Sequence, residues 1–249
     1  MKLIFALGNP EPEFTHTRHN VGKDVLNQFV QKLFSNYNWE FKSKFQSDLI
    51  FTNKPTSPSI FSGIQNLFSS FSSSTFKKQS DEKLNNQLNT EINMHPPSNS
   101  NTSNTNQNVP PQTNDTPDAI LAKPTCYMNE VGIPLQKIAT FYKIQPQDIL
   151  IIYDELDLVV GEYKLSQGKG SKIHNGVKSI NSSLKNSNKI WHLRIGVRDE
   201  KIGQSVQKSG RDPKKYVLAK FPISDRKKIE KLTEESIISD LNTWLSKKD

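Results

Sequence analysis

Residues 149–153 constrain the fold more than any other stretch, because five apolar residues follow one another and are succeeded directly by Asp154. A strand that is apolar on both faces lies at the centre of a sheet and is covered by helices on both sides. Central strands of this kind are typical of α/β domains, in which ligands bind at the carboxyl ends of the strands. The carboxylate of Asp154 is therefore expected at the edge of the sheet where a site would form.

The flanking sequence alternates between strand patterns and helix patterns. Apolar runs and alternating residues predict further strands at residues 2–7, 48–52, 119–123, 161–165 and 191–197. A helical spacing of apolar residues predicts helices at 21–33, 134–142, 177–184 and 224–245. The pattern as a whole predicts a single three-layer α/β/α domain with a mixed, mostly parallel central sheet.

One long segment departs from this alternation. Residues 53–116 are dominated by Ser, Asn, Thr, Gln and Pro. A segment of that composition cannot bury enough apolar surface to fold, so we predict a low-complexity, disordered insertion. The folded domain is then made of residues 1–52 and 117–249. Expansion of a surface loop is the default interpretation, and partner binding through the phenylalanines of the insertion is the alternative.

The charge of the chain bears on its partners. Its 249 residues carry a formal net charge of +8 and give a sequence pI of about 9.4. A basic domain favours a polyanionic partner, nucleic acid before membrane, although a solvated basic surface without a partner is the alternative. No apolar run approaches the ~20 residues needed to span a bilayer. The single cysteine, Cys126, allows no intrachain disulfide and favours a reducing compartment. The insertion rich in Asn and Ser is more typical of a eukaryotic chain, so both cytoplasm and mitochondrion stay open.

Polar side chains gather where the predicted strands end. If these ends share one edge of the sheet, the side chains converge in one cleft: Asn9, His19, Asn129, Asp154, His174 and Asn175. Asp154 would then accept a hydrogen bond from His19, which fixes the imidazole tautomer and leaves the other ring nitrogen free to deprotonate water. General-base assistance of this kind contributes roughly 10²–10⁴ in rate.

Other chemistries find less support in the sequence. Cys126 fits a packed thiol better than a nucleophile. His16 and His19 are three residues apart, but no spacing of Cys, His or carboxylate completes a zinc set. Residues 168–170 only loosely resemble a phosphate loop, because the Walker pattern is not met. We therefore expect neither a metal nor a cofactor.

Ordered sequence blocks on both sides of the insertion identify a family. The chain is similar to the bacterial-type peptidyl-tRNA hydrolases in Leu7-Gly8-Asn9-Pro10, Thr17-Arg18-His19-Asn20-Val21-Gly22, Lys123-Pro124-Thr125, Tyr127-Met128-Asn129, Tyr142-Lys143-Ile144, Asp154-Glu155-Leu156-Asp157-Leu158, His174-Asn175-Gly176 and Leu193-Arg194-Ile195-Gly196. The resemblance implies a monomeric, metal-free esterase. Such an enzyme cleaves the ester that joins a peptide to the terminal ribose of tRNA.

The same resemblance implies roles for individual residues. His19 would be the base that activates water, Asp154 would support its basic form, and Asn9 would help to distinguish peptidyl-tRNA from free aminoacyl-tRNA. The substrate site would contain Phe14, Asn20, Tyr127, Met128, Asn129, His174 and Asn175, and tRNA phosphate would be bound by Lys164 and Arg194. The residues themselves leave simpler alternatives open. Asn20, Asn129 and Asn175 could cap helices, and Arg194 could pair with a carboxylate.

The chain also departs from the family pattern, which keeps a second function open. Glu11 follows Pro10 where the family has glycine, and Phe14 stands in place of a tyrosine. Lys169, Lys172 and Ile173 interrupt a loop that is nearly all glycine in the family, and Val159-Val160 replaces Pro-Pro. The alternative to a hydrolase is therefore a catalytically impaired, RNA-binding relative.

Overall fold

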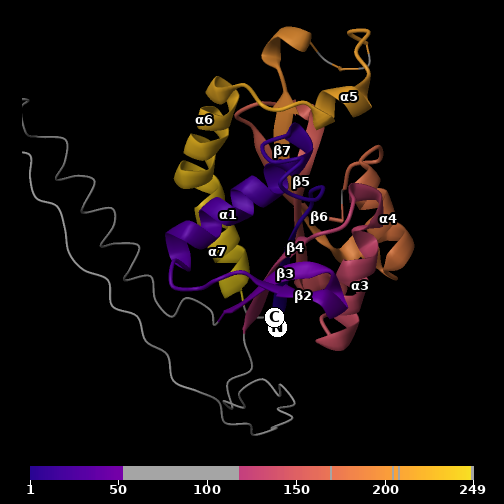
Figure 1. Cartoon of the computed structure of the whole chain (residues 1–249), viewed down its shortest axis with the longest axis vertical. Helices are drawn as coiled ribbons and strands as arrows, with labels where there is room; N and C mark the ends of the chain where they lie inside the picture. The colour runs from indigo at the N-terminus through magenta and orange to yellow at the C-terminus, as the bar shows by residue number, and fades with distance from the viewer. Residues whose placement is uncertain (53–117, 169, 204, 207, 248–249) are drawn as a thin grey trace, which may run out of the picture. The chain divides into compact units, whose positions relative to one another are not determined.

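The computed structural model describes residues 1–52, 118–168, 170–203, 205–206 and 208–247. The predicted insertion, residues 53–116, lies outside the described residues, so its disorder stays a prediction. The described residues contain a central sheet with helices packed on it (Figure 1).

The sheet has seven strands in the order β2-β3-β4-β1-β5-β7-β6 within the described residues. These strands are β1 (Lys2–Ala6), β2 (Glu40–Lys42), β3 (Ser47–Thr52), β4 (Ala119–Pro124), β5 (Ile149–Val159), β6 (Tyr163–Gln167) and β7 (Trp191–Arg198). The four central strands β4, β1, β5 and β7 are parallel, whereas β3 and β6 run antiparallel to their neighbours at the two sides. The predicted mixed, mostly parallel sheet is confirmed.

Helices cover both faces of this sheet. One face carries α1 (Val21–Leu33), α6 (Ile223–Leu232) and α7 (Ile238–Ser246), and the other carries α3 (Gly132–Phe141) and α4 (Asn175–Ser183) (Figure 1). Successive residues of a strand point to opposite faces. Leu150 and Ile152 accordingly pack in the core under α1, and Ile149 and Ile151 pack in the core under α3 and α4. The expected three-layer α/β/α arrangement is confirmed.

Three elements differ from the sequence expectation. The short strand β2 was not expected, and β5 runs on to Val159 because β7 continues to pair with it as far as Arg198. The C-terminal helix, expected to be continuous over residues 224–245, contains a π-helical turn, Thr233–Ile237, between α6 and α7. The Thr233 hydroxyl donates a hydrogen bond to the carbonyl oxygen of Ile229 at 2.7 Å, a contact that loosens the helical ladder where the turn widens.

The start of α1 packs directly on the strand ends that carry the polar residues. A Cβ on Gly22 would collide with the carbonyl oxygen of Ile152 and would lie 2.9 Å from that of Leu7. Only glycine allows this approach. As a result, the 3₁₀ turn Arg18–Asn20, which leads into α1, lies against β5 and is hydrogen-bonded to Asn9 in the loop after β1.

Candidate active site

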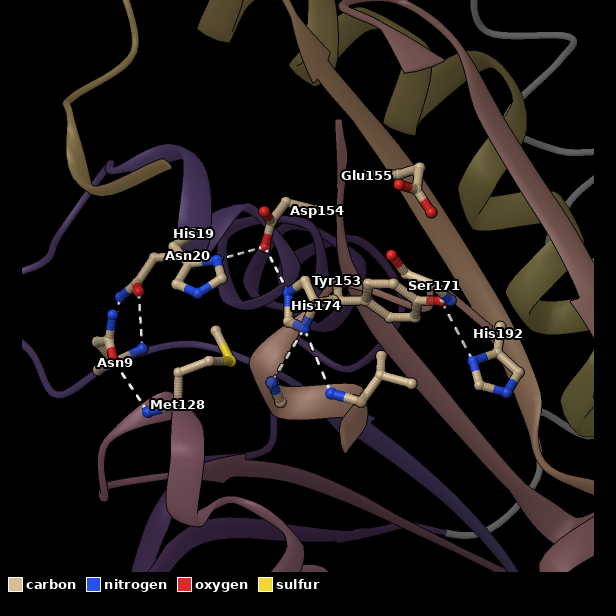
Figure 2. A network of polar contacts seen from close by, with 12 residues as sticks. Asn9, His19, Asn20, Met128, Tyr153, Asp154, Glu155, Ser171, His174 and His192 are labelled. Atoms are coloured by element: carbon tan, nitrogen blue, oxygen red, sulfur yellow. Dashed lines mark hydrogen bonds and ion pairs between the residues drawn. The ribbon is translucent and has the colours of Figure 1, made fainter. Parts of the chain in front are cut away.

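His19 and Asp154, which are 135 residues apart in the sequence, form a hydrogen-bonded pair at the end of β5. The His19 Nδ1 atom lies 2.8 Å from Asp154 Oδ1, and both residues are buried (Figure 2). A carboxylate can only accept a hydrogen bond, so His19 carries its proton on Nδ1. The other ring nitrogen, Nε2, has no hydrogen-bond partner among the described residues and keeps its lone pair. This is the arrangement of a general base.

His174 binds the same carboxylate oxygen from the other side. Its Nε2 atom lies 2.8 Å from Asp154 Oδ1, and its Nδ1 atom accepts the main-chain N–H groups of Gly176 and Val177 at 3.1 and 3.3 Å (Figure 2). His174 is thus the N-cap of α4. Because Nδ1 must accept, the ring is neutral with its proton on Nε2, and that N–H donates to Asp154.

Burial and hydrogen bonding together set the charges in this cluster. Burial by itself would raise the pKa of Asp154, but the two imidazoles hold it well below its usual range, so the carboxylate is ionised. Burial lowers the pKa of His174 and keeps it neutral. For His19, burial also acts to lower the pKa, but the charge of Asp154 and its hydrogen bond outweigh that effect and raise the pKa above 6.5.

The tautomer of His174 bears on metal binding. One ligand atom from each of His19, Asp154 and His174 lies within 4.8 Å of the others, close enough for a shared cation. Coordination through Nε2 of His174 would need a lone pair there and would move the proton to Nδ1. That proton would face the N–H groups of Gly176 and Val177. The residues present therefore fit a hydrogen-bonded base better than a metal centre.

Asn9 is held in place by four hydrogen bonds. Its main-chain N–H donates to Asn20 Oδ1 at 2.8 Å, and its carbonyl oxygen accepts from Asn20 Nδ2 at 3.1 Å and from Lys23 Nζ at 2.7 Å. The Asn9 side-chain oxygen accepts the main-chain N–H of Met128 at 2.9 Å (Figure 2). Within the described residues, the Asn9 side-chain NH₂ group has no hydrogen-bond partner. Asn9 therefore offers a fixed donor beside the His19 pair.

These residues surround a cavity of about 690 Å³. Nine of the residues predicted for the site line it: Asn9, Phe14, His19, Tyr127, Met128, Asn129, Asp154, His174 and Asn175. Asn20 is fully buried behind Asn9 and does not line the cavity, so its expected place at the substrate is not what the geometry shows. Phe14 and Tyr127 meet edge to face, with ring centroids 6.3 Å apart.

Comparison with known proteins assigns this chain to a family. The model of the peptidyl-tRNA hydrolase family matches residues 3–60 and 80–248. The chain belongs to the peptidyl-tRNA hydrolase family. A peptidyl-tRNA hydrolase from Francisella tularensis subsp. tularensis (strain SCHU S4 / Schu 4) is 38% identical over 237 residues, which cover 95% of this chain and 87% of the relative. One from Corynebacterium efficiens is 28% identical over 219 residues, which cover 88% of this chain and 82% of the relative.

Solved structures carry the same fold. A peptidyl-tRNA hydrolase in complex with N-propanol superposes with a TM-score of 0.64 at 22% identity, covering 98% of this chain and 88% of the other. A peptidyl-tRNA hydrolase from Acinetobacter baumannii gives a TM-score of 0.58 at 20% identity, covering 98% of this chain and 94% of the other. The family prediction is thereby confirmed, and so is its fold. Within the described residues, no helix combines the length and apolar character needed to cross a bilayer.

One wall of the cavity carries residues to which the sequence analysis assigns no role in the site. Helix α5 (Pro213–Leu218) and the residue before it supply Asp212, Pro213, Lys214, Val217 and Leu218 to this lining. Glu155, Leu156 and Ser171 complete it. Arg18 holds α5 in place, because its guanidinium lies 4.3 Å from the ring centroid of Tyr216 and 3.4 Å from the carbonyl oxygen of Ala219. Asp212 before Pro213 is a helix-start signal that could have predicted α5, although not where it packs.

The helix-cap alternative fails for the three asparagines. The cap of α4 is the His174 side chain, so Asn175 is free to face the cavity. Asn129 lies inside the 3₁₀ turn Met128–Glu130, ahead of α3, and also lines the cavity. Asn20 occupies the N-cap position of α1, but its side chain makes no cap hydrogen bond there.

The two residues predicted to bind tRNA phosphate lie outside the cavity. Lys164 and Arg194 are paired across β6 and β7, and Lys164 is exposed. Arg194 Nη1 lies 3.7 Å from Glu155 Oε2, and only 16% of the arginine side chain is exposed. The geometry therefore matches the carboxylate-pairing alternative for Arg194, and the phosphate role of both residues stays a prediction.

Proposed function

We propose that this chain hydrolyses the ester bond between the peptide and the tRNA of peptidyl-tRNA, with His19 as the general base. The observation that carries the proposal is the 2.8 Å contact of His19 Nδ1 with buried Asp154, which leaves Nε2 without a partner among the described residues, beside a cavity of about 690 Å³. Membership of the peptidyl-tRNA hydrolase family supplies the substrate class.

The proposed reaction begins with water bound next to His19 Nε2. This nitrogen takes one proton as the water oxygen attacks the ester carbonyl carbon, and the carbonyl oxygen becomes an oxyanion. The imidazolium that forms is stabilised by ionised Asp154, because opposite charges attract strongly in a buried site. The tetrahedral intermediate then collapses, the bond to the ribose oxygen breaks, and His19 returns its proton to that oxygen. The peptide is released as a carboxylic acid, which loses its remaining proton to solvent, and the tRNA is released with a free ribose hydroxyl.

Carboxamides near the base supply the remaining donors. Asn129 and Asn175 line the cavity and are the candidates for donating to the oxyanion. One well-placed donor of this kind contributes roughly 10²–10³ in rate. Asn9, fixed by Asn20, Lys23 and Met128, is proposed to read the peptide bond that distinguishes peptidyl-tRNA from aminoacyl-tRNA.

A pair of matched histidine variants tests the proposal. The assay is turnover of an N-blocked aminoacyl-tRNA, with the unblocked form as the specificity control. His19→Asn is expected to abolish turnover and to leave tRNA binding nearly intact, because only the base is removed. His16→Asn is the control, since His16 is half exposed, lies outside the cavity and accepts an asparagine at its positive φ of 59°.

Two outcomes would overturn the assignment. Unchanged turnover in His19→Asn would remove His19 as the base. If the unmodified chain binds tRNA but shows no turnover, it is instead the catalytically impaired, RNA-binding relative considered in the sequence analysis. We also propose that the chain is a monomer, which light scattering would test. Its proposed location, the cytoplasm or a mitochondrion, would be tested by cell fractionation.

A further inference from the structure

A second polar network lies behind the His19 pair and reaches the loop at residues 168–174. The main-chain N–H of Ser171 donates to the hydroxyl oxygen of Tyr153 at 2.9 Å, and the same hydroxyl lies 3.3 Å from His192 Nδ1 (Figure 2). Ser171 lines the cavity, whereas Tyr153 and His192 are buried on neighbouring strands β5 and β7. A single hydroxyl group, that of Tyr153, therefore hydrogen-bonds both the loop in the cavity wall and the neighbouring strand of the sheet.

The direction of these hydrogen bonds follows from the donors available. Ser171 N–H can only donate, so it occupies a lone pair of the Tyr153 oxygen. The tyrosine O–H then has His192 Nδ1 as its acceptor within the described residues. Burial lowers the pKa of His192 to about 4, and the charge of Arg194 adds to this effect, so the ring is neutral and Nδ1 can accept.

Gly170 shows that the loop backbone is fitted to His192. A Cβ at Gly170 would lie 2.6 Å from His192 Cε1 and 2.9 Å from Nδ1. The imidazole of His192 therefore packs directly against the Cα atom of Gly170, the residue before Ser171. The Tyr153 ring also lies 4.9 Å, centroid to centroid, from the ring of His174, at the far end of the same loop. Both ends of residues 170–174 thus contact the Tyr153–His192 pair.

We infer that Tyr153 and His192 are positioning residues that fix the loop at residues 170–174, and so set where Ser171 and Ile173 meet the substrate. The inference rests on the proposed hydrolase function. It explains how a loop that keeps few glycines holds one shape: the anchor is a side-chain hydroxyl on the central strand. Neither residue touches the reacting atoms, and neither contacts His19 or Asp154 by a hydrogen bond.

Tyr153→Phe removes the anchor with little change of volume. We expect kcat/KM for an N-blocked aminoacyl-tRNA to fall about tenfold, the factor that one net hydrogen bond represents, with the change mainly in KM. The acid limb of the pH profile should not move, because the His19–Asp154 pair is unaltered. Solvent exchange of the Ser171 amide proton, followed by NMR, should accelerate. Tyr163→Phe is the matched control, since its hydroxyl bonds Asp240 at 2.8 Å and it does not line the cavity.

Variants of His192 test the other half of the pair. His192→Leu should reproduce the rise in KM, and His192→Asn should restore most of the loss because a carboxamide oxygen can accept the tyrosine O–H. If Tyr153→Phe does not fold, His192→Leu with its rescue by His192→Asn decides the question.

The inference fails if the Ser171 amide exchanges faster in the variants while KM is unchanged. It also fails if Tyr163→Phe raises KM equally, or if His192→Asn behaves like His192→Leu. Absence of turnover in the unmodified chain would instead defeat the proposed function, so the two failures are distinguishable.

Discussion

Replacing Asp154 with asparagine separates the charge of this residue from its shape. The carboxamide oxygen can still accept a hydrogen bond from His19, so the geometry is retained, but the negative charge is lost. Two unit charges 2.8 Å apart attract by about 6 kcal/mol at an effective dielectric constant of 20. The carboxamide dipole replaces part of this attraction, which leaves a loss of about 3–5 kcal/mol in the transition state. That corresponds to a fall in kcat of roughly 10²–10⁴.

The same change predicts a shift in the pH profile. His19 must be neutral to act as a base, so activity is lost as the pH falls through its pKa. In the unmodified chain, Asp154 raises this pKa above 6.5 against the effect of burial. Without the charge, the hydrogen bond to a neutral carboxamide remains as the only contribution from residue 154, and burial then lowers the pKa of His19. The acid limb of kcat/KM in Asp154→Asn is therefore expected to move to lower pH.

The assay is initial-rate hydrolysis of an N-blocked aminoacyl-tRNA across pH 5–9. The control is Asp157→Asn, an exposed carboxylate on the same strand that does not line the cavity. An acid limb that stays in place in Asp154→Asn would show that Asp154 does not set the basicity of His19. A loss of kcat below tenfold would refute the magnitude argued from the ion pair.

Three further predictions concern packing, burial and charge. In Gly176→Ala the new methyl group would lie 2.6 Å from Met128 Sδ, so we expect a loss of about 1–3 kcal/mol in unfolding free energy, measured by urea titration. Burial lowers the pKa of Lys23 from 10.5 to about 8, so between these pH values the unfolded chain binds more protons than the folded chain. The unfolding free energy of the unmodified chain, compared with that of Lys23→Met, should therefore rise as the pH increases from 8 to 10.5. Equal pH dependence of the two chains would contradict this. Lys164→Gln should reduce the slope of log K against log salt for tRNA binding by about one, and an unchanged slope would remove Lys164 from the phosphate contacts.

The pairing of His19 with Asp154 could be predicted because it depends on strand order at one edge of a parallel sheet. Apolar runs located β1 and β5, which are neighbours in the sheet. His19 lies in the turn that follows β1 and leads into α1, so it reaches Asp154 at the carboxyl end of β5. Helix α1 was predicted with its observed limits, residues 21–33, because its apolar residues recur at a regular helical spacing. In these places local pattern and tertiary structure agree.

Other parts of the site depend on contacts that no local pattern encodes. The wall formed by α5 is held by Arg18 through cation–π stacking and carbonyl contacts some 200 residues away in the sequence. The sequence placed His174 near the site, but its tautomer follows from its role as the cap of α4. Asn20 was assigned to the substrate, whereas its side chain holds the main chain of Asn9.

The protonation state of the histidines is the most direct test of this mechanism. Long-range ¹H–¹⁵N NMR spectra of the unmodified chain and of His19→Asn and His174→Asn would assign the tautomer and titration of each ring. We predict that neutral His19 carries its proton on Nδ1 and that its pKa is higher than that of an ordinary imidazole and matches the acid limb of turnover. We also predict that His174 stays neutral with its proton on Nε2. A His19 ring protonated on Nε2 when neutral would leave no lone pair for water and would contradict the proposed role of His19 as the base.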